Sequence, residues 1–342
     1  MKVKSAIFSL TLGVFLFSCE SDKEFTNSLI DFNQEKELQG YHFGEKISFP
    51  EEITKNIDKV NISFGEEESD DLTITPKYFH LGGNKVNFNI QTKGGKNIQQ
   101  EAIINVFTDN GEKNINYTIA KEYPHSTENF VQGFELEGNT IYESEGGQGN
   151  SHILKYQLGQ THPTVSIPQS EEIFAEGCTV IGDKIYQLTW LNKKGFIYDK
   201  ATLKLIKEFD YPNSLGEGWG LTYDGEHLIV SDGSNQLYFL DPENPSEMVK
   251  TIFVAGNQRA YPRLNELEYH NGFIYANVWQ EPIIVKINPK TGEAVGKFDF
   301  SEIVKKHTTA DDDVLNGITF KGDNMLITGK NWNTIYEVSI TN

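Results

Sequence analysis

The chain is poor in cysteine and in basic residues. Its 342 residues include only 2 cysteines, so a fold held together by a framework of disulfides is excluded. Acidic side chains number 49 against 30 basic ones, and the formal net charge is −19. This balance argues against a nucleic-acid partner, because phosphate binding needs clustered lysine and arginine. The rest is a globular composition, 37% hydrophobic and 23% charged, with enough length for two or three domains.

Long apolar runs are also scarce, and the clearest one lies at the N-terminus. Lys2 and Lys4 precede an apolar run over residues 6–17, which is too short to span a bilayer comfortably and is typical of a signal peptide. The run ends in Leu-Phe-Ser-Cys, which resembles a bacterial lipobox with Cys19 as the lipidated residue. We predict a lipoprotein signal peptide over 1–19 and a protein exported to the cell envelope and lipid-anchored there. An ordinary cleaved signal is the alternative.

Between this leader and residue 121 the pattern predicts a tether and a small β domain. Residues 20–41 are polar, which is typical of a tether. Residues 42–121 alternate apolar and polar side chains with period two, and a strong turn signal at 109–111 predicts a hairpin between 102–107 and 115–119. We therefore expect an Ig-like β-sandwich of about 80 residues.

Residues 122–342 repeat a strand–turn–strand pattern. The aligned turn residues are separated by 44, 43, 46 and 51 positions, and they are Gly138, Gly182, Gly225, Asn271 and Gly322. Apart from a turn at Ser301–Val304, no amphipathic helix interrupts the repeats. Five β-repeats of about 40–50 residues predict an all-β fold, a five-bladed β-propeller. Cys178 lies in an apolar strand of the second repeat, which favours a buried, inert thiol over a nucleophile.

Two positions of the repeat carry unusual chemistry. The first column, six residues before each turn, holds Gln132, Glu176, Trp219, Asn265 and Asn316. The second column, eight residues after each turn, holds Gly146, Trp190, Gly233, Trp279 and Lys330. Equivalent positions of the blades form rings, and two antiparallel strands joined by a short turn bring their far ends together. Both columns should therefore lie at one mouth of the channel.

A purely structural ring would repeat one residue type, and these columns do not. They combine one carboxylate, one ammonium, three amides and three indoles. Such departures from local consistency are expected at functional sites. The alternative is that the tryptophans fill the core and the polar groups satisfy one another. We interpret the convergence of all of them as an active site.

The segments around these columns resemble the plant-and-bacterial type of glutaminyl cyclase, the glutamine cyclotransferase family. The resemblance extends from about residue 123 to the C-terminus and is carried, in order, by Phe130–Gly133, Phe174–Gly177, Tyr186–Trp190, Gly216–Thr222, Ser231–Ser234, Arg263–Tyr269, Ala276–Trp279, Leu315–Ile318 and Thr328–Lys330. The family is known as a five-bladed propeller, in agreement with the repeat count. It converts an N-terminal glutamine of a peptide or protein into pyroglutamate and releases ammonia.

The resemblance and the chemistry together imply a role for each residue type. Glu176 would bind the substrate amine, take its proton and return it to the leaving group, while Lys330 and Asn265 would donate to the oxyanion. Gln132 and Asn316 would contact the substrate. The pocket wall would comprise Phe130, Phe174, Trp190, Trp219 and Trp279.

The sequence also leaves two alternative functions and allows predictions about cofactors and partners. A propeller that binds peptides or carbohydrates without turnover is the rival function, and the pair of Glu176 and Lys330 argues against it because binding alone does not require that pair. A scaffold that only docks partners is a second rival. The eight histidines show no paired ligand spacing, so no cofactor is expected for catalysis, while a structural metal ion in the channel stays open. We expect a monomer that acts on peptides or proteins with an N-terminal glutamine.

Overall fold

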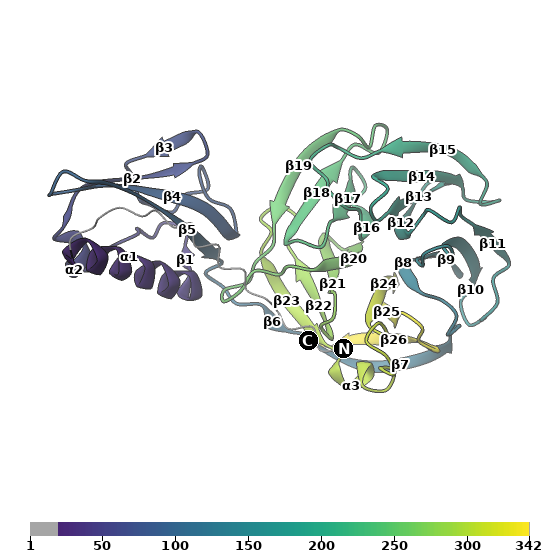
Figure 1. Ribbon diagram of the computed structural model, residues 1–342. Helices are drawn as coiled ribbons and strands as arrows, with labels where there is room; N and C mark the ends of the chain where they lie inside the picture. The colour runs from purple at the N-terminus through teal and green to yellow at the C-terminus, as the bar shows by residue number, and fades with distance from the viewer. Residues whose placement is uncertain (1–19, 342) are drawn as a thin grey trace. The chain divides into compact units, whose positions relative to one another are not determined.

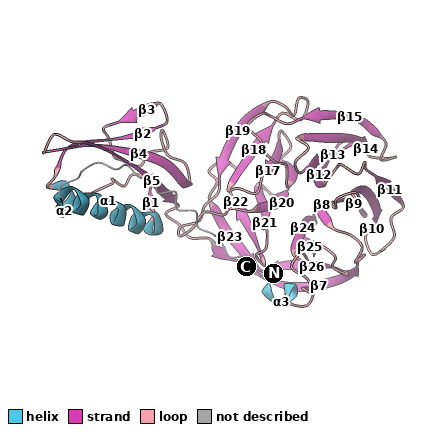
Figure 2. Cartoon of the chain, viewed as in Figure 1, coloured by secondary structure: helices cyan, strands magenta, loops and turns pink. Residues whose placement is uncertain are grey.

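The computed structural model describes residues 20–341, which divide into two compact units. The first unit contains the described residues up to Leu38 together with Lys46–Leu72 and Lys85–Ile103. The second contains Gln39–Glu45, Thr73–Asn84 and the chain from Ile104 onward. Both are built mainly from strands, with few helices (Figures 1 and 2). The predicted signal peptide and Cys19 lie outside the described residues.

The segment predicted as a tether is instead the longest helix of the described chain, α1 (Glu20–Gln39). Phe25, Leu29 and Phe32 are buried, and their spacing of four and three residues places them on one helical face. Phe32 contacts Phe49 at 5.0 Å between ring centroids, and Phe49 contacts Phe88 at 5.3 Å. This apolar stripe explains why the polar segment is ordered.

One five-stranded sheet follows, rather than the two packed sheets of the predicted sandwich. Its order is β1-β5-β4-β2-β3. The strands and a short helix have these bounds: β1 (Tyr41–His42), α2 (Glu51–Thr54), β2 (Ile57–Phe64), β3 (Glu67–Ser69), β4 (Gly82–Thr92) and β5 (Asn97–Phe107). Helix α1 is linked to this sheet through Phe49, whose ring contacts Phe32 of α1 and Phe88 of β4. The period-two alternation therefore predicted strands correctly, but it did not distinguish one sheet from two packed sheets.

The second unit contains five antiparallel sheets in chain order (Figure 1). The first sheet comprises β8 (Val131–Glu137), β9 (Thr140–Glu145), β10 (His152–Gln157) and β11 (Val165–Pro168). The second comprises β12 (Ala175–Ile181), β13 (Lys184–Thr189), β14 (Lys194–Asp199) and β15 (Leu205–Asp210). The third comprises β16 (Leu221–Tyr223), β17 (Leu228–Ser231), β18 (Gln236–Leu240) and β19 (Met248–Phe253).

The last two sheets each recruit a strand from the segment before the repeats. The fourth comprises β20 (Leu264–His270), β21 (Phe273–Val278), β22 (Ile283–Ile287), β23 (Ala294–Asp299) and the parallel strand β6 (Lys113–Asn114). The fifth comprises β24 (Leu315–Lys321), β25 (Asn324–Gly329), β26 (Thr334–Thr341) and β7 (Asn116–Pro124). Between them lies the short helix α3 (Ser301–Val304), where the sequence predicts a turn.

Every turn residue used to align the repeats adopts a left-handed backbone. The φ angles are 64° at Gly138, 60° at Gly182, 97° at Gly225, 48° at Asn271 and 63° at Gly322. Each turn joins the first and second strands of its sheet, so the alignment is structurally consistent. The first strands contact one another in a closed cycle, β8 to β12, β16, β20, β24 and back to β8.

The hairpin predicted around residues 109–111 is wrong. Strand β7 pairs with the C-terminal strand β26 from Asn116↔Thr341 to Pro124↔Thr334, and β5 lies in the first sheet of the chain. The repeat at the C-terminal end of the chain contains only three strands, and β7, which precedes the first repeat, is the fourth strand of its sheet. The two ends of the ring are thus joined by backbone hydrogen bonds, and the strand begins before the boundary at residue 121 that the sequence predicts.

The core of the second unit lies between neighbouring sheets. One apolar cluster joins the first two sheets and includes Tyr142, Ile153, Ile185 and Phe196. It also includes Cys178, a free cysteine that is 2% exposed. Burial raises the pKa of the Cys178 thiol well above its usual range, which keeps it protonated and unreactive, as predicted.

Candidate active site

Four of the five first-column residues lie at a β-bulge. The register between the first and second strands shifts between Val131 and Gly133, between Ala175 and Cys178, between Leu264 and Leu267, and between Leu315 and Ile318. The shifts therefore flank Gln132, Glu176, Asn265 and Asn316. A bulge leaves an extra residue outside the ladder and re-aims its side chain, which is a recurring device beside active sites. In the third sheet, Trp219 lies just before β16 begins.

Backbone hydrogen bonds bring the second column to the same end of the sheets. The N–H of Trp190 donates to the carbonyl of Phe174 at 3.0 Å, and the N–H of Lys330 donates to Val314 at 3.0 Å. The same bond joins Gly146 to Phe130 at 3.0 Å and Trp279 to Arg263 at 2.8 Å. Each acceptor lies two residues before a first-column residue, so both columns share one end.

The two glycines of the second column leave room for neighbouring rings. A Cβ atom at Gly146 would lie 2.6 Å from the ring of Phe174, and one at Gly233 would lie 2.6 Å from the ring of Trp219. Glycine is required at these two positions because the rings of Phe174 and Trp219 occupy the space that a larger side chain would need. This packing explains why two positions of the second column are glycine.

The polar members form a chain across three sheets. Gln132 donates from Nε2 to Oε1 of Glu176 at 3.1 Å, and Asn316 donates from Nδ2 to Oε1 of Gln132 at 3.2 Å. Asn316 also donates to the carbonyl of Val131 at 2.8 Å. Lys330 lies over the ring of Phe130, with Nζ 4.6 Å from the centroid. Amide, carboxyl and ammonium groups are thus assembled in one buried layer.

Two buried amide oxygens in this layer lack a partner. Within the described residues, Oδ1 of Asn265 and Oδ1 of Asn316 accept no hydrogen bond. Both side chains are almost fully buried, at 3% and 0% exposure. Because an unpaired buried polar atom is unfavourable, these oxygens are suited to a polar ligand such as a carboxamide or an amine.

The electrostatics of Glu176 and Lys330 are set mainly by burial. Desolvation raises the pKa of the Glu176 carboxyl well above its usual range; the nearby Lys330 opposes this shift and Glu217 adds to it. Desolvation lowers the pKa of the Lys330 ammonium, opposed by Glu176 and Asp312. Both groups are therefore moved toward their neutral forms, which suits a carboxyl that exchanges a proton with an amine near neutral pH.

The aromatic residues lie at the same end in edge-to-face contacts. Phe130 and Phe174 have centroids 6.4 Å apart, Phe174 and Trp190 are 5.6 Å apart, and Trp219 and Trp279 are 5.7 Å apart. These rings supply an apolar wall beside the polar layer. All ten residues predicted for the active site therefore lie at the shared end of the sheets.

Sequence reasoning missed a second carboxylate at this end. Glu217 accepts hydrogen bonds from the indole nitrogens of Trp190 and Trp219, at 2.6 and 2.8 Å. It lies outside both columns because the loop before β16 carries it. Its position two residues before Trp219 is the feature of the sequence that could have indicated it.

A further column of the repeat, with two carboxylates and three threonines, was also missed. The position three residues before each turn holds Glu135, Thr179, Thr222, Glu268 and Thr319. Thr179 donates to Glu135 at 3.0 Å, and desolvation raises the pKa of Glu135 to about 7. Glu266 accepts from the backbone N–H of Ile318 at 2.8 Å, and burial raises its pKa and that of Glu268 well above the usual range. Aligning one more position of the repeats would have found this column.

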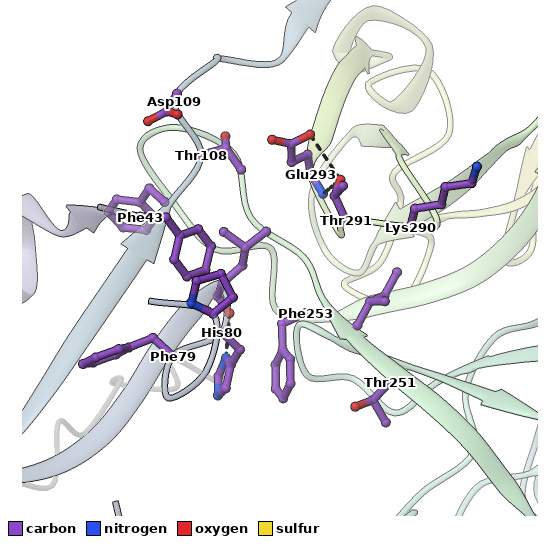
Figure 3. Close-up of a pocket in the computed structure, with 14 residues that line it drawn as sticks. Phe43, Phe79, His80, Thr108, Asp109, Thr251, Phe253, Lys290, Thr291 and Glu293 are labelled. Carbon is purple, nitrogen blue, oxygen red and sulfur yellow. Dashed lines mark hydrogen bonds between the residues drawn. The ribbon is translucent and has the colours of Figure 1, made fainter. Parts of the chain in front are cut away.

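A separate pocket of about 460 Å³ lies in the second unit, away from the columns (Figure 3). It is lined by Phe79, His80, Thr251 and Phe253 among others, and none of the ten predicted residues lines it. The rings of His80 and Phe253 stack at 3.5 Å. Figure 3 shows that rings such as Phe79 and Phe253 share this pocket with polar side chains such as Lys290 and Glu293. Across residues 20–341, no three His, Cys, Asp or Glu side chains are placed to hold a metal ion.

These features define a class of protein: mostly β, with antiparallel sheets in cyclic contact and a buried acid, ammonium and amides at one end. The family model for glutamine cyclotransferase matches residues 94–340. A glutaminyl-peptide cyclotransferase of Arabidopsis thaliana is 36% identical over 228 residues, covering 65% of this chain and 70% of that protein. The chain belongs to the glutamine cyclotransferase family.

A solved structure shows the same similarity. The glutaminyl cyclase of Myxococcus xanthus matches with a TM-score of 0.62 and 32% sequence identity. The match covers 68% of this chain and all of that one. The similarity thus extends from sequence to fold.

Proposed function

We propose that this protein is a glutaminyl-peptide cyclotransferase that converts the N-terminal glutamine of a peptide or protein into pyroglutamate and releases ammonia. The reaction is an intramolecular acyl transfer: the α-amine replaces ammonia on the side-chain carboxamide carbon. Family membership and the names of both relatives support this assignment. The five sheets, with first strands in a closed cycle and both chain ends in one sheet, support a five-bladed β-propeller as its scaffold.

Glu176 carries the proton in this proposal. A free α-amine has a pKa of about 7.7–8.0, so most of it is protonated at pH 7 and cannot attack. A carboxyl whose pKa is raised by burial exchanges a proton with such an amine at little free-energy cost. Glu176 accepts a proton from the amine as the nitrogen–carbon bond of the five-membered ring forms. It then passes this proton to the carboxamide nitrogen, whose bond to the same carbon breaks, so that the nitrogen leaves as ammonia.

The neighbouring groups stabilise the carboxamide as it changes. Lys330 and Asn265 donate to the oxygen that becomes negative when the amine adds to the carbon. Gln132 and Asn316 contact the substrate amide and backbone. The wall of Phe130, Phe174, Trp190, Trp219 and Trp279 excludes water and holds the glutamine side chain curled toward its own amine, which turns proximity into rate.

One observation carries the proposal: a buried carboxyl and a buried ammonium lie at the same end of the sheets beside unpaired amide oxygens. The test incubates the full chain with a peptide that begins with glutamine and follows the loss of one ammonia by mass spectrometry. The matched control is the same peptide beginning with asparagine, whose shorter side chain would have to close a four-membered ring. Binding of the glutamine peptide without loss of ammonia would favour the non-catalytic alternative.

We also propose that the protein is exported and anchored in the bacterial cell envelope by lipid on Cys19, and that it acts as a monomer. The leader sequence supports the anchor. None of the helices in the part of the chain that the structure describes is long and apolar enough to cross a membrane. Cys19→Ser should move the protein from the membrane fraction to the soluble fraction. An unchanged membrane fraction would contradict the lipid anchor.

A further inference from the structure

The aromatic wall consists of two groups of rings. Phe130, Phe174 and Trp190 form one group through edge-to-face contacts at 6.4 and 5.6 Å. Trp219 and Trp279 form the other, with centroids 5.7 Å apart and planes at 88°. No ring contact between the two groups is found among the described side chains. Some other feature must therefore set their relative position.

Glu217 links these two groups. Its Oε2 atom accepts a hydrogen bond from Nε1 of Trp190 at 2.6 Å and another from Nε1 of Trp219 at 2.8 Å. The two indoles come from different sheets, since Trp190 follows β13 and Trp219 precedes β16. Hydrogen bonds to a carboxylate are roughly twice as strong as those between neutral groups. One carboxyl oxygen therefore joins the two parts of the wall.

The loop that carries Glu217 is fixed by its neighbours. The N–H of Gly218 donates to the carbonyl of Trp190 at 3.3 Å. A Cβ atom at Gly218 would lie 2.6 Å from the hydroxyl oxygen of Tyr211 and 2.9 Å from the carbonyl oxygen of Thr189, so only glycine fits there. The Tyr211 hydroxyl in turn donates to that Thr189 carbonyl at 2.8 Å. The backbone next to Glu217 is thus held against the end of β13.

We propose that Glu217 is a positioning residue of this site, which acts through Trp190 and Trp219 to hold the aromatic wall in one arrangement. The inference rests on the proposed cyclisation for its kinetic consequence. A substrate glutamine must curl so that its amine meets its own carboxamide, and a wall with two independently moving parts would hold that conformer poorly. Loss of Glu217 should therefore weaken productive substrate binding more than it slows the chemical step.

The test compares Glu217→Ala and Glu217→Gln in the full chain by steady-state kinetics on a glutamine-initiated peptide. The alanine variant should raise KM about tenfold, since one tenfold step corresponds to the loss of about one charge-assisted hydrogen bond, and should change kcat less. The glutamine variant keeps an acceptor oxygen, so its KM should lie between wild type and alanine. Glu226→Ala, an exposed acidic residue in the turn of the same sheet, is the matched control and should leave both constants unchanged.

A double-mutant cycle separates action through the indoles from a direct effect on the substrate. Trp190→Phe keeps an aromatic ring and removes the N–H donor. If Glu217 acts through Trp190, the KM changes of Glu217→Ala and Trp190→Phe should be less than additive. Full additivity, an unchanged KM in Glu217→Ala, or a Glu217→Gln variant as impaired as Glu217→Ala would each overturn the proposal.

A spectroscopic readout keeps this inference distinct from the proposed function. The near-UV circular dichroism of the folded protein reports the fixed environment of the indoles and requires no turnover. It should lose intensity in Glu217→Ala and not in Glu226→Ala. A wild-type protein that released no ammonia would contradict the cyclisation and leave this readout valid, whereas an unchanged spectrum in Glu217→Ala would contradict the positioning role.

Discussion

At the scale of residues, burial moves the two key ionisable groups in the way that the chemistry needs. Desolvation raises the pKa of Glu176 and lowers that of Lys330, and their mutual attraction opposes both shifts. A carboxyl with an ordinary pKa would be a weak base toward an ammonium group, and an ordinary lysine would be strongly hydrated. In the proposed mechanism the shifted carboxyl accepts a proton from an amine, and a dry lysine donates to a developing oxyanion.

Lys330→Met should lower kcat about 10²–10³-fold, because methionine fills the space and cannot donate to the oxyanion. The measurement is kcat and KM on a glutamine-initiated peptide, with circular dichroism to confirm folding. If Lys330 and Glu176 serve the same transition state, as we propose, the variant lacking both should lose less than the product of the single effects. An unchanged kcat in the folded Lys330→Met protein would remove the lysine from the mechanism.

Glu135 gives a prediction about stability and pH. Its pKa is raised from its ordinary value of 4.5 to about 7, so the folded protein binds this proton more tightly than the unfolded chain does. The resulting stability is fully present below pH 4.5 and is lost as the pH rises through about 7. The protein should therefore unfold at a lower temperature at pH 8 than at pH 6.

Glu135→Gln should reduce that difference in melting temperature between pH 6 and pH 8. The corresponding change in the free energy of unfolding should be on the order of 1 kcal/mol. This is smaller than the full pKa shift implies, because the Glu135 side chain keeps some exposure to solvent. Glu171→Gln is the matched control, an exposed acid in the loop before β12 that does not contribute to the pKa shift of Glu135. An equal pH dependence in wild type and Glu135→Gln would show that Glu135 does not carry this proton.

At the scale of elements, turns could be predicted from the sequence and bulges could not. A left-handed turn position strongly favours glycine or asparagine, so Gly138 and Asn271 revealed the repeat directly. A bulge has no comparable residue signature, because the extra residue is chosen for function. The polar residues of the first column were therefore found by alignment, while the reason that they leave the ladder came only from the structure.

Strand partners were predicted less well than strands. The residues of β7 alternate as a strand should, yet their partner lies at the other end of the chain. A local turn signal at 109–111 favoured a hairpin, and tertiary pairing overrode it. In the same way α1 was missed because its apolar stripe consists of only three residues in a polar segment.

Closure of the ring by β7 predicts how truncations behave. A chain that begins at Glu122 keeps only Glu122, Tyr123 and Pro124 of the paired residues and loses those from Asn116 to Lys121. Compared with a chain that begins at Lys113, it should melt about 10 °C lower, because several paired residues are lost and each kcal/mol corresponds to about 2–4 °C in a domain of this size. Differential scanning calorimetry of both chains makes the comparison. Equal melting temperatures would mean that this pairing does not stabilise the ring.

At the scale of the whole molecule, the second unit builds one site from many separate contributions. Each repeat supplies one to three side chains, and the periodicity places them at the same end. The sequence could predict that convergence because it follows from the fold's periodicity. It could not predict Glu217, which lies in a loop outside the periodic positions, or the single sheet of the first region, where alternation does not distinguish one sheet from two.

We propose above all that Glu176 carries the proton in an intramolecular cyclisation at this site. The most direct measurement is the rate of ammonia release from a glutamine-initiated peptide by wild type and by Glu176→Gln, with folding of both confirmed by circular dichroism. Glutamine keeps the size and the hydrogen bond to Gln132 but cannot accept a proton, so kcat should fall about 10²–10⁴-fold while KM changes less. Ordinary turnover by the folded Glu176→Gln protein would contradict the account.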